Sequence, residues 1–269
     1  MNKKLTATGS QSLPFAWQFP LTTTHGQCTQ PPLVAGDRLV CVTSSSVFAV
    51  DIYTGEEVKA DNGFPFNLNP SMDATPPLTH SRGILYFMDN RELLARQLSD
   101  GRVPTRRQDN TTVPRWKAPR FEDEVVSVRA SDDVVVVCQA DPQTRATGFD
   151  AVTGALLWGP VTVSQDSPGQ VEATRDAIVF VSGGHLFAVN IRSGDTRFDF
   201  KPANDSLSQT NPPVIAELRD QSIVVIAGKS VYGVDLKTGK QLWTKAAPKP
   251  TANRQWLAPA IDEIGRAHV

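Results

Sequence analysis

One eleven-residue phrase recurs along this chain, and it limits the fold more than any other feature. Two copies, Gly148 to Trp158 and Gly233 to Trp243, have the form Gly-x-Asp-x-x-Thr-Gly-x-x-x-Trp. Partial copies occupy 49–59, 95–105 and 188–198, so successive copies begin 46, 53, 40 and 45 residues apart. A period of about 40–50 residues is typical of propellers and of solenoids built from small repeated units.

The residues around each copy predict strands. Apolar runs rich in β-branched residues, such as 134–137 and 223–227, precede the copies and are bounded by Gly, Pro, Ser and Asp. Runs of this length are typical of strands rather than helices. Each period therefore predicts four short antiparallel strands, and radial repetition of such units predicts an all-β propeller. We expect one domain over 15–262, with about five blades, the start of a sixth, and an incomplete ring.

The Asp and Gly positions of the phrase predict the turn before the last strand of each blade. The Asp side chain can accept hydrogen bonds from N–H groups a residue or two onward. The Gly supplies the positive φ that a bulged hairpin needs. Because these residues recur in every blade, we interpret them as structural rather than catalytic. They are Asp51 and Gly55, Asp100 and Gly101, Asp150 and Gly154, Asn190 and Gly194, and Asp235 and Gly239.

An aromatic residue stands four positions after the glycine in three copies: Trp158, Phe198 and Trp243. Rings of this size bury about 150–250 Å², so we expect them to close the interface between one blade and the next. Lys59 and Thr105 occupy this position in the first two copies. Other residues must therefore close the first two interfaces.

The repeated phrase resembles that of quinoprotein, or PQQ-like, β-propellers, and the resemblance covers about residues 15–262. It implies one of two functions. Some members are alcohol or sugar dehydrogenases that hold pyrroloquinoline quinone and calcium, whereas others lack the cofactor and serve as interaction scaffolds or sensor domains. We expect a non-catalytic scaffold that holds no cofactor and binds protein partners or senses a ligand through its inter-blade loops. The alternative is a fragment of a dehydrogenase that depends on the quinone and calcium.

Cysteine and histidine residues predict no catalytic, cofactor or metal site. Cys28, Cys41 and Cys138 are far apart and lack zinc spacing, so we interpret them as buried thiols. The quinoprotein enzymes often carry an adjacent Cys-Cys pair, which this chain does not have. The four histidines share no ligand spacing. The chain is therefore more typical of a binding protein than of an enzyme.

The longest repeat interval contains a basic segment. Arg106, Arg107 and Arg115 surround Trp116, and acidic residues follow at 122–124. Such a loop could bind an acidic partner, or it could be a solvated loop whose charges pair locally. We treat it as a candidate partner loop.

A second candidate loop spans 61–70. It contains Phe64 and Phe66, which we expect at the surface.

Charge and hydropathy exclude some functions. A net charge of −1 gives no electrostatic basis for binding nucleic acid, and no stretch has the length of a membrane-spanning helix. The segment 1–14 lacks the apolar core of a signal peptide, which predicts a cytoplasmic protein as written. A periplasmic location would require an incomplete amino terminus.

The two ends of the chain suggest a truncated sequence. Residues 263–269 resemble a translated sequencing adapter, so we expect them to be non-native. Residues 255–262 would then open a sixth blade that the chain does not complete. Trp17 to Phe19 resembles a strand that would complete the last blade of a closed ring.

Overall fold

The computed structural model describes residues 28–68, 77–108, 111–114, 116, 119–140, 143–209, 213–217, 222–246, 260–261 and 267–268. Within these ranges every regular element is a β-strand, and no helix is present. Four antiparallel sheets have four strands, one has three, and two short hairpins form sheets of two strands. The predicted all-β class is confirmed. The described part of the chain contains no helix of the length and apolarity that crossing a membrane would require.

Each blade is a meander, because its strands pair in chain order. Blade 1 contains β1 (Leu33–Ala35), β2 (Arg38–Val42), β3 (Ser46–Asp51) and β4 (Phe66–Asn67). Blade 2 contains β5 (Leu78–Ser81), β6 (Ile84–Asp89) and β7 (Glu92–Gln97). Blade 3 contains β10 (Val125–Ser131), β11 (Val134–Ala140), β12 (Thr144–Asp150) and β13 (Leu156–Ser164). Blade 4 contains β14 (Glu172–Ala173), β15 (Ala177–Ser182), β16 (His185–Asn190) and β17 (Thr196–Phe200). Blade 5 contains β18 (Val214–Glu217), β19 (Ser222–Ala227), β20 (Ser230–Asp235) and β21 (Gln241–Ala246).

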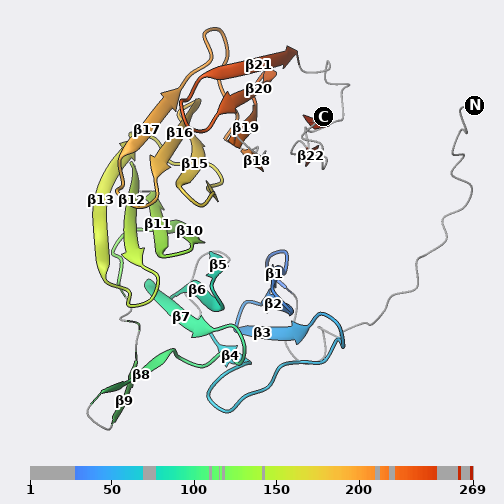
Figure 1. Cartoon of the computed structure of the whole chain (residues 1–269), viewed down its shortest axis with the longest axis vertical. Coiled ribbons are helices and arrows are strands. Elements are labelled where there is room, and N and C mark those ends of the chain that lie inside the picture. Colours follow the sequence, from blue (N-terminus) through green and yellow to red (C-terminus); the bar gives the residue numbers. More distant parts are fainter. Residues whose placement is uncertain are drawn as a thin grey trace, which may run out of the picture.

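The five blades follow one another around an open arc (Figure 1). The first strands β1, β5, β10 and β18 lie toward the concave side, and β13, β17 and β21 lie along the convex side. No sheet closes the arc within the described residues, so the incomplete propeller expected from the repeats is confirmed. Blade 2 differs from the expectation because it has three strands. The hairpin of β8 (Thr105–Gln108) and β9 (Thr111–Pro114) projects away from the arc instead of adding a fourth.

Two strands near the end of the chain lie apart from the five blades. β22 (Ala260–Ile261) pairs with β23 (Ala267–His268) in an antiparallel ladder. The segment expected to be a non-native tail therefore supplies β23. Residues 255–259 and 262, which were assigned to a sixth blade, lie outside the described residues. The segment 1–14 and Trp17 to Phe19 also lie outside them.

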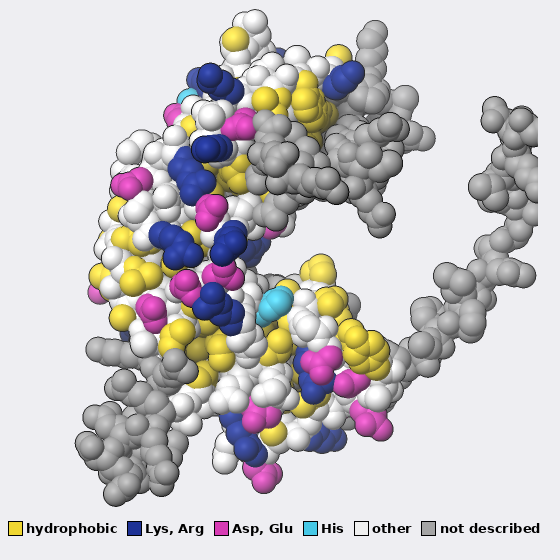
Figure 2. Space-filling view, in the orientation of Figure 1, with side chains coloured by type: hydrophobic (Ala, Val, Ile, Leu, Met, Phe, Trp, Pro, Cys, Tyr) yellow, Lys and Arg dark blue, Asp and Glu magenta, His cyan; other side chains and the backbone are white. Residues whose placement is uncertain are grey.

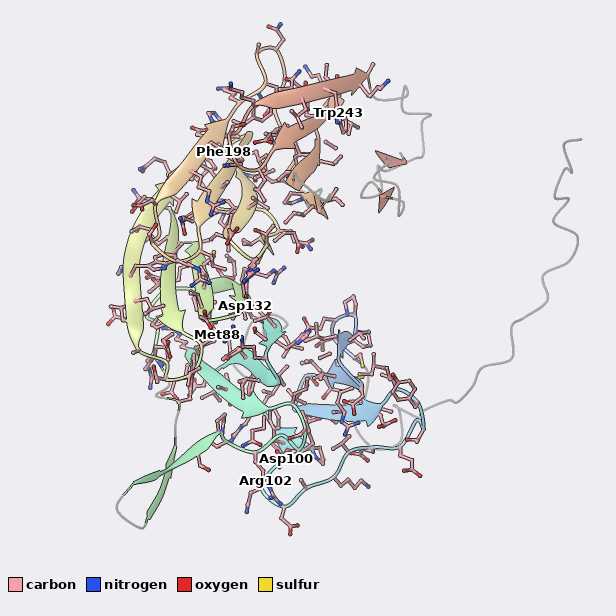
Figure 3. All side chains as sticks on the ribbon, viewed as in Figure 1. Met88, Asp100, Arg102, Asp132, Phe198 and Trp243 are labelled. Carbon is pink, nitrogen blue, oxygen red and sulfur yellow. The ribbon has the colours of Figure 1, made fainter. Side chains whose placement is uncertain are left out.

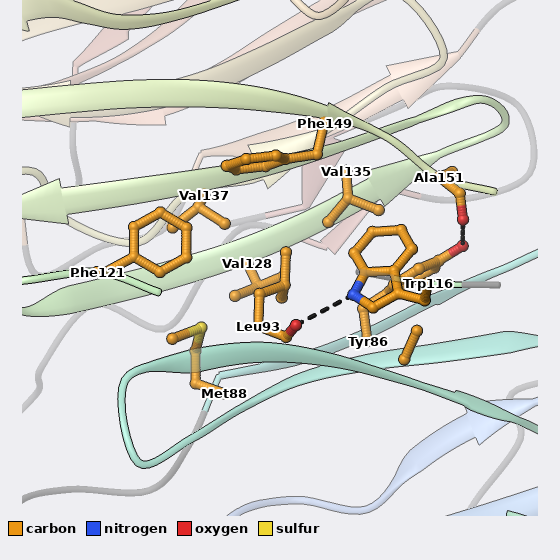
Figure 4. Packing of buried hydrophobic residues seen from close by; sticks show 11 residues of the cluster. Tyr86, Met88, Leu93, Trp116, Phe121, Val128, Val135, Val137, Phe149 and Ala151 are labelled. Carbon is orange, nitrogen blue, oxygen red and sulfur yellow. Dashed lines mark hydrogen bonds between the residues drawn. The ribbon is translucent and has the colours of Figure 1, made fainter. Parts of the chain in front are cut away.

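The hydrophobic core lies between the blades. Four of the five buried clusters each join residues from two neighbouring sheets, and Figure 4 shows the cluster between blades 2 and 3. A central blade is covered on both faces, so β15 is buried at every position. Burial on both faces explains why its sequence, AIVFVS, is an apolar run and not an alternating pattern.

Candidate functional site

The first hairpins of three successive blades line a hollow on the arc. It has a volume of about 590 Å³ and is open to solvent. We call it the inter-blade hollow. Its lining consists of His80, Ser81 and Arg82 from blade 2, Ala130, Ser131 and Asp132 from blade 3, and Ala173, Thr174 and Arg175 from blade 4. Asp132 lies toward the inner side of the arc (Figure 3).

Tight turns place the charged side chains at the hollow. Ser81 pairs with Ile84 and Ser131 pairs with Val134, so each hairpin turns through only two residues. The first residue of each turn has a left-handed backbone, with φ of 47° at Arg82 and 38° at Asp132. Two-residue hairpins favour positive φ because it matches the twist of the strands. The two turns thereby present charged side chains at equivalent positions in successive blades.

Five charged residues form a network across the three blades. Asp133 Oδ1 lies 2.5 Å from Arg82 Nη1, and its Oδ2 lies 3.6 Å from Arg192 Nη1. Asp132 Oδ2 lies 3.3 Å from Arg175 Nε, and its Oδ1 lies 3.9 Å from Arg82 Nε. Basic and acidic side chains lie side by side over the middle of the arc (Figure 2).

These ion pairs are exposed, so they hold side chains in position more than they stabilise the fold. An exposed pair contributes about 0–1 kcal/mol, because water and salt screen the charges. Arg175 is 76% exposed, and its ion pair with Asp132 uses Nε. Three guanidinium groups face two carboxylates, so the network has a formal charge of +1.

Hydroxyl groups tie the same turns together. Ser81 Oγ donates to the backbone carbonyl of Asp132 (3.5 Å), and Ser131 Oγ donates to that of Arg175 (3.1 Å). Ser81 and Ser131 both stand immediately before their turns. Blade 2 therefore contacts the first turn of blade 3 in the same way as blade 3 contacts the first turn of blade 4.

His80 is the titratable group at the blade 2 side of the hollow. It lies half-buried in β5, and burial lowers the pKa of its imidazole below the usual histidine value. A hydrogen bond to the Val34 backbone in blade 1 opposes part of this shift. The neutral ring is therefore the main form at pH 7.

The lining of the inter-blade hollow does not fit the calcium that some PQQ-like propellers hold. Calcium takes about six to eight oxygen ligands, whereas the lining supplies one carboxylate, Asp132, beside Arg82 and Arg175. The two guanidinium groups would repel a divalent cation, and the imidazole of His80 is the only ring in the lining. Among the described residues, no three His, Cys, Asp or Glu side chains are grouped so that they could hold a metal ion.

The repeated Asp residues lie in turns away from the lining of the hollow. Asp51 Oδ1 accepts hydrogen bonds from the N–H groups of Tyr53 and Thr54, both at 3.0 Å. These bonds are the largest cause of the lowered pKa of the Asp51 carboxyl. Gly55 has a φ of 73° and donates its N–H to the Asp51 carbonyl. Similar side-chain bonds are made by Asp150 to Val152 and Thr153, by Asn190 to Arg192, and by Asp235 to Thr238. Gly154, Gly194 and Gly239 likewise have positive φ and donate to the carbonyls of those residues.

Blade 2 builds this turn with different residues. Gln97 occupies the Asp position, and its carbonyl accepts the N–H of Gly101 at 2.7 Å. Asp100 occupies the Thr position, and its Oδ1 accepts the N–H of Arg102 at 3.0 Å. Thr54 Oγ1 accepts the N–H of Glu56 in the same way in blade 1. Figure 3 shows Asp100 and Arg102 near the outer part of the arc.

The repeated aromatic rings lie over the glycines. The indole of Trp158 covers Gly148 of its own blade and Gly194 of the next, where an added Cβ would meet the ring at 2.5 Å. Trp158 Nε1 also donates to the Ile191 carbonyl of blade 4 at 3.0 Å. Phe198 covers Gly239 of blade 5 in the same manner, and Trp243 covers Gly233. Phe198 comes from β17 and Trp243 from β21 (Figure 3).

Phe64 closes the interface between blades 1 and 2, in place of Lys59. Its ring lies on Gly101, and its N–H donates to the Asp100 carbonyl at 2.8 Å. Lys59 is exposed and pairs with Glu57. The expectation that Phe64 and Phe66 lie at the surface is wrong for Phe64, whose side chain is only 1% exposed, and Phe66 is partly buried against the same cluster.

Trp116 and Tyr86 occupy the interface between blades 2 and 3 (Figure 4). The two ring centroids lie 5.2 Å apart, and Trp116 Nε1 donates to the Leu93 carbonyl at 3.1 Å. Tyr86 donates its hydroxyl to the Ala151 carbonyl of blade 3 at 2.6 Å. Ala151 and Ile191 are equivalent, since each follows the turn residue of its blade. Tyr86 therefore makes the contact that Trp158 makes one interface later.

The candidate partner loop is not a single exposed surface. Trp116 is 6% exposed and belongs to the core between blades 2 and 3, so its indole cannot contact a partner. Arg106 and Arg107 belong to β8, but the structure does not describe their side chains. Arg115 lies outside the described residues.

The sequence reasoning missed the residues of the hollow. No role was predicted for Arg82, Arg175 or Arg192. The sequence does contain one indication of these residues, which is their position in each period. A charged residue stands at or beside the first hairpin turn of three successive blades, outside the repeated phrase.

The fold and the hollow together define a class of protein: an incomplete β-propeller of PQQ-like repeats, with a charged hollow between its first hairpins. Residues 67–199 and 142–266 match the family model described as "Outer membrane protein assembly factor BamB". The two matches together cover more than half of the chain, so the chain belongs to this family of PQQ-like propellers.

Solved structures share the fold. The crystal structure of BamB from Moraxella catarrhalis aligns with a TM-score of 0.54 and 12% identity over 79% of this chain and 62% of that one. A quinohemoprotein alcohol dehydrogenase from Pseudomonas putida HK5 aligns with a TM-score of 0.53 and 17% identity over 88% of this chain and 44% of that one. The chain thus spans less than two thirds of either protein. The comparison with curated proteins finds no match.

Proposed function

We propose that this chain is a non-catalytic binding propeller that holds a segment of a partner protein in the inter-blade hollow. The charge network carries the proposal. Arg175 is highly exposed and engages Asp132 through Nε, so its Nη atoms can bind a carboxylate of the partner. Asp132 and Asp133 hold the guanidinium groups in place, which lowers the entropic cost of binding. The family description, which names an assembly factor, supports a role in binding other proteins.

Charge reversal at the hollow tests this proposal. Acidic, neutral and basic peptides of equal length would be titrated against the full chain, with and without Arg175→Glu. Arg120→Glu is the matched control, because Arg120 is also exposed and paired with a carboxylate, that of Glu92, but does not line the hollow. We expect acidic peptides to bind more weakly as salt rises, and Arg175→Glu to weaken their binding about tenfold or more. Equal binding by the two variants would contradict the proposal.

The dehydrogenase alternative requires a separate assay. The chain would be mixed with pyrroloquinoline quinone and calcium, and dye reduction would be measured with alcohols and sugars. A binding propeller gives no turnover above the quinone alone. Turnover that depends on the chain would overturn the proposal, whatever the peptides do.

A further inference from the structure

Two of the three cysteines meet at the edge of blade 1. Cys28 forms an isolated antiparallel bridge with Thr43, and the N–H of Thr29 donates to the Val42 carbonyl at 2.9 Å. Cys28 is opposite Thr43 in this pairing, so Cys41 is its diagonal neighbour on the same face. Side chains in diagonal positions can reach one another across an antiparallel pair.

The two thiols are in contact. Cys41 is buried in a cluster with Phe48 and Val50, and Cys28 packs against that cluster half-buried. The Cys28 thiol also contributes to the raised pKa of the Cys41 thiol, as expected for neighbouring side chains. The sequence suggested three unrelated buried thiols. Instead, two form a pair, and only Cys138 stands apart, in the cluster between blades 3 and 4.

We propose that Cys28 and Cys41 form an intramolecular disulfide when the chain meets a small disulfide such as oxidised glutathione. The Cys28 thiolate attacks one glutathione sulfur, and the first glutathione leaves as a thiol. Cys41 Sγ then attacks Cys28 Sγ and gives its proton to the glutathione sulfur that leaves, so the second glutathione is released as a thiol. Two protein thiols are oxidised to one disulfide, and one glutathione disulfide is reduced to two thiols.

Accessibility fixes the order of attack. Cys28 is partly exposed, whereas Cys41 is 2% exposed. Burial, with a smaller contribution from Cys28, raises the pKa of the Cys41 thiol to about 12, so Cys41 is protonated at neutral pH and is a poor nucleophile. Cys28 therefore reacts first with the external disulfide, and Cys41 resolves the mixed disulfide from inside the protein.

The local backbone allows the two sulfur atoms to bond. A disulfide needs Cα atoms within about 7 Å, and diagonal neighbours in a regular ladder lie about 7–8 Å apart. A small approach is therefore needed, and Cys28 can make it. Cys41 is fixed in β2 between β1 and β3, whereas Cys28 belongs to an isolated bridge rather than a named strand. The bond would fasten the segment before β1 to the middle of blade 1.

Thiol counting and peptide mapping test this inference. The full chain would be equilibrated with reduced or oxidised glutathione, unfolded and alkylated. We expect three alkylated cysteines after reduction and one, Cys138, after oxidation. A non-reduced digest should contain a peptide that links Cys28 to Cys41, about 2 Da lighter than its two reduced parts.

Variants separate the pair from the third thiol. Cys138→Ala, the matched control, should keep the link, and Cys28→Ser should lose it. Cys28 is only half-buried, so the folded state should tolerate its replacement. Oxidation should raise the melting temperature of the Cys138→Ala variant and leave that of Cys28→Ser unchanged. Three alkylatable thiols after oxidation, or a link from Cys28 to Cys138 or to a second chain, would overturn the inference.

Discussion

Glycines in the repeated turns satisfy two requirements at once. Gly194 and Gly239 have φ values of 79° and 70°, which other residues rarely adopt. Each also lies directly beneath an aromatic ring from the preceding blade, at a distance that leaves no room for a Cβ. The turn and the blade interface therefore depend on the same atom being absent. A substitution at these positions disturbs both a hairpin and the packing of two blades.

Replacing Gly194 with alanine should therefore lower the free energy of unfolding. The left-handed backbone accounts for a loss of about 1–2 kcal/mol. Forcing a methyl group against the Trp158 ring adds a loss of about 1–3 kcal/mol. Gly83→Ala is the control, since Gly83 has a φ of 75° but no atom within 4 Å of an added Cβ. Urea unfolding of both variants measures the difference. Equal losses would show that the contact with the ring does not matter.

His80 should make stability depend on pH. Its folded-state pKa is lowered, mainly by burial, so the unfolded chain takes up a proton at a higher pH than the folded chain does. The free energy of unfolding is therefore highest, as far as His80 determines it, above the pKa of the unfolded chain, near 6.5. It falls as the pH drops below that value. Urea unfolding at several pH values between 5 and 8 would show this slope. A His80→Gln variant should have a shallower slope, and an unchanged slope would assign the effect to other groups.

Turn residues could be predicted from the sequence because their contacts are local. The Asp51 carboxylate bonds with groups two and three residues onward, so residue identity and spacing contain the whole contact. Blade 2 shows the limit of this reasoning. Asp100 replaces the hydroxyl of a threonine there, and Gln97 stands where the other blades have Asp or Asn. Matching residue letters alone assigns the Asp100 carboxylate to the wrong turn position.

At the scale of elements, the blade interfaces share one hydrogen bond made by unrelated residues. The Ile191 carbonyl receives the indole N–H of Trp158, and the equivalent Ala151 carbonyl receives the hydroxyl of Tyr86. Trp158 comes from the fourth strand of its blade and Tyr86 from the second. The sequence could predict the first contact from the repeat. It could not predict the second, since that contact depends on where β6 lies relative to blade 3.

The inserted hairpin and the tryptophan that follows it should contribute very differently to stability. β8 and β9 pair only with each other, whereas Trp116 is buried between two blades. Replacing 106–113 with a short Gly-Ser linker should change the free energy of unfolding by less than about 1 kcal/mol, because loop length has a small effect. Trp116→Ala should cost about 3–5 kcal/mol. Urea unfolding of both variants measures the difference. A large loss of unfolding free energy in the linker variant would show that the hairpin stabilises the fold.

At the scale of the molecule, the blades form a chain of neighbours. Blade 3 packs on blades 2 and 4, and blade 4 packs on blades 3 and 5. The sequence predicted this order from the period of the repeat, and it predicted the open arc from the number of copies. It did not predict the inter-blade hollow, whose lining comes from three blades and depends on the angles between them.

The exchange rates of backbone amides should differ along the arc according to burial. β15 is buried throughout, whereas five of the six residues of β21 are exposed. We expect backbone amides of β15 and β16 to exchange slowest and those of β21 fastest, because local opening is easiest where few apolar contacts are lost. Native-state exchange read by mass spectrometry would show this order. Uniform protection would mean that the arc opens only as a single unit.

The hydroxyl contacts of Ser81 and Ser131 give the molecule a mechanical property. Each serine links the tip of one hairpin to the next, and the hollow lies where the three hairpins converge. A small rotation of one blade against its neighbour changes the width of the hollow, since the tips lie at the free ends of the hairpins. Packing at the blade interfaces thus sets the width of the hollow.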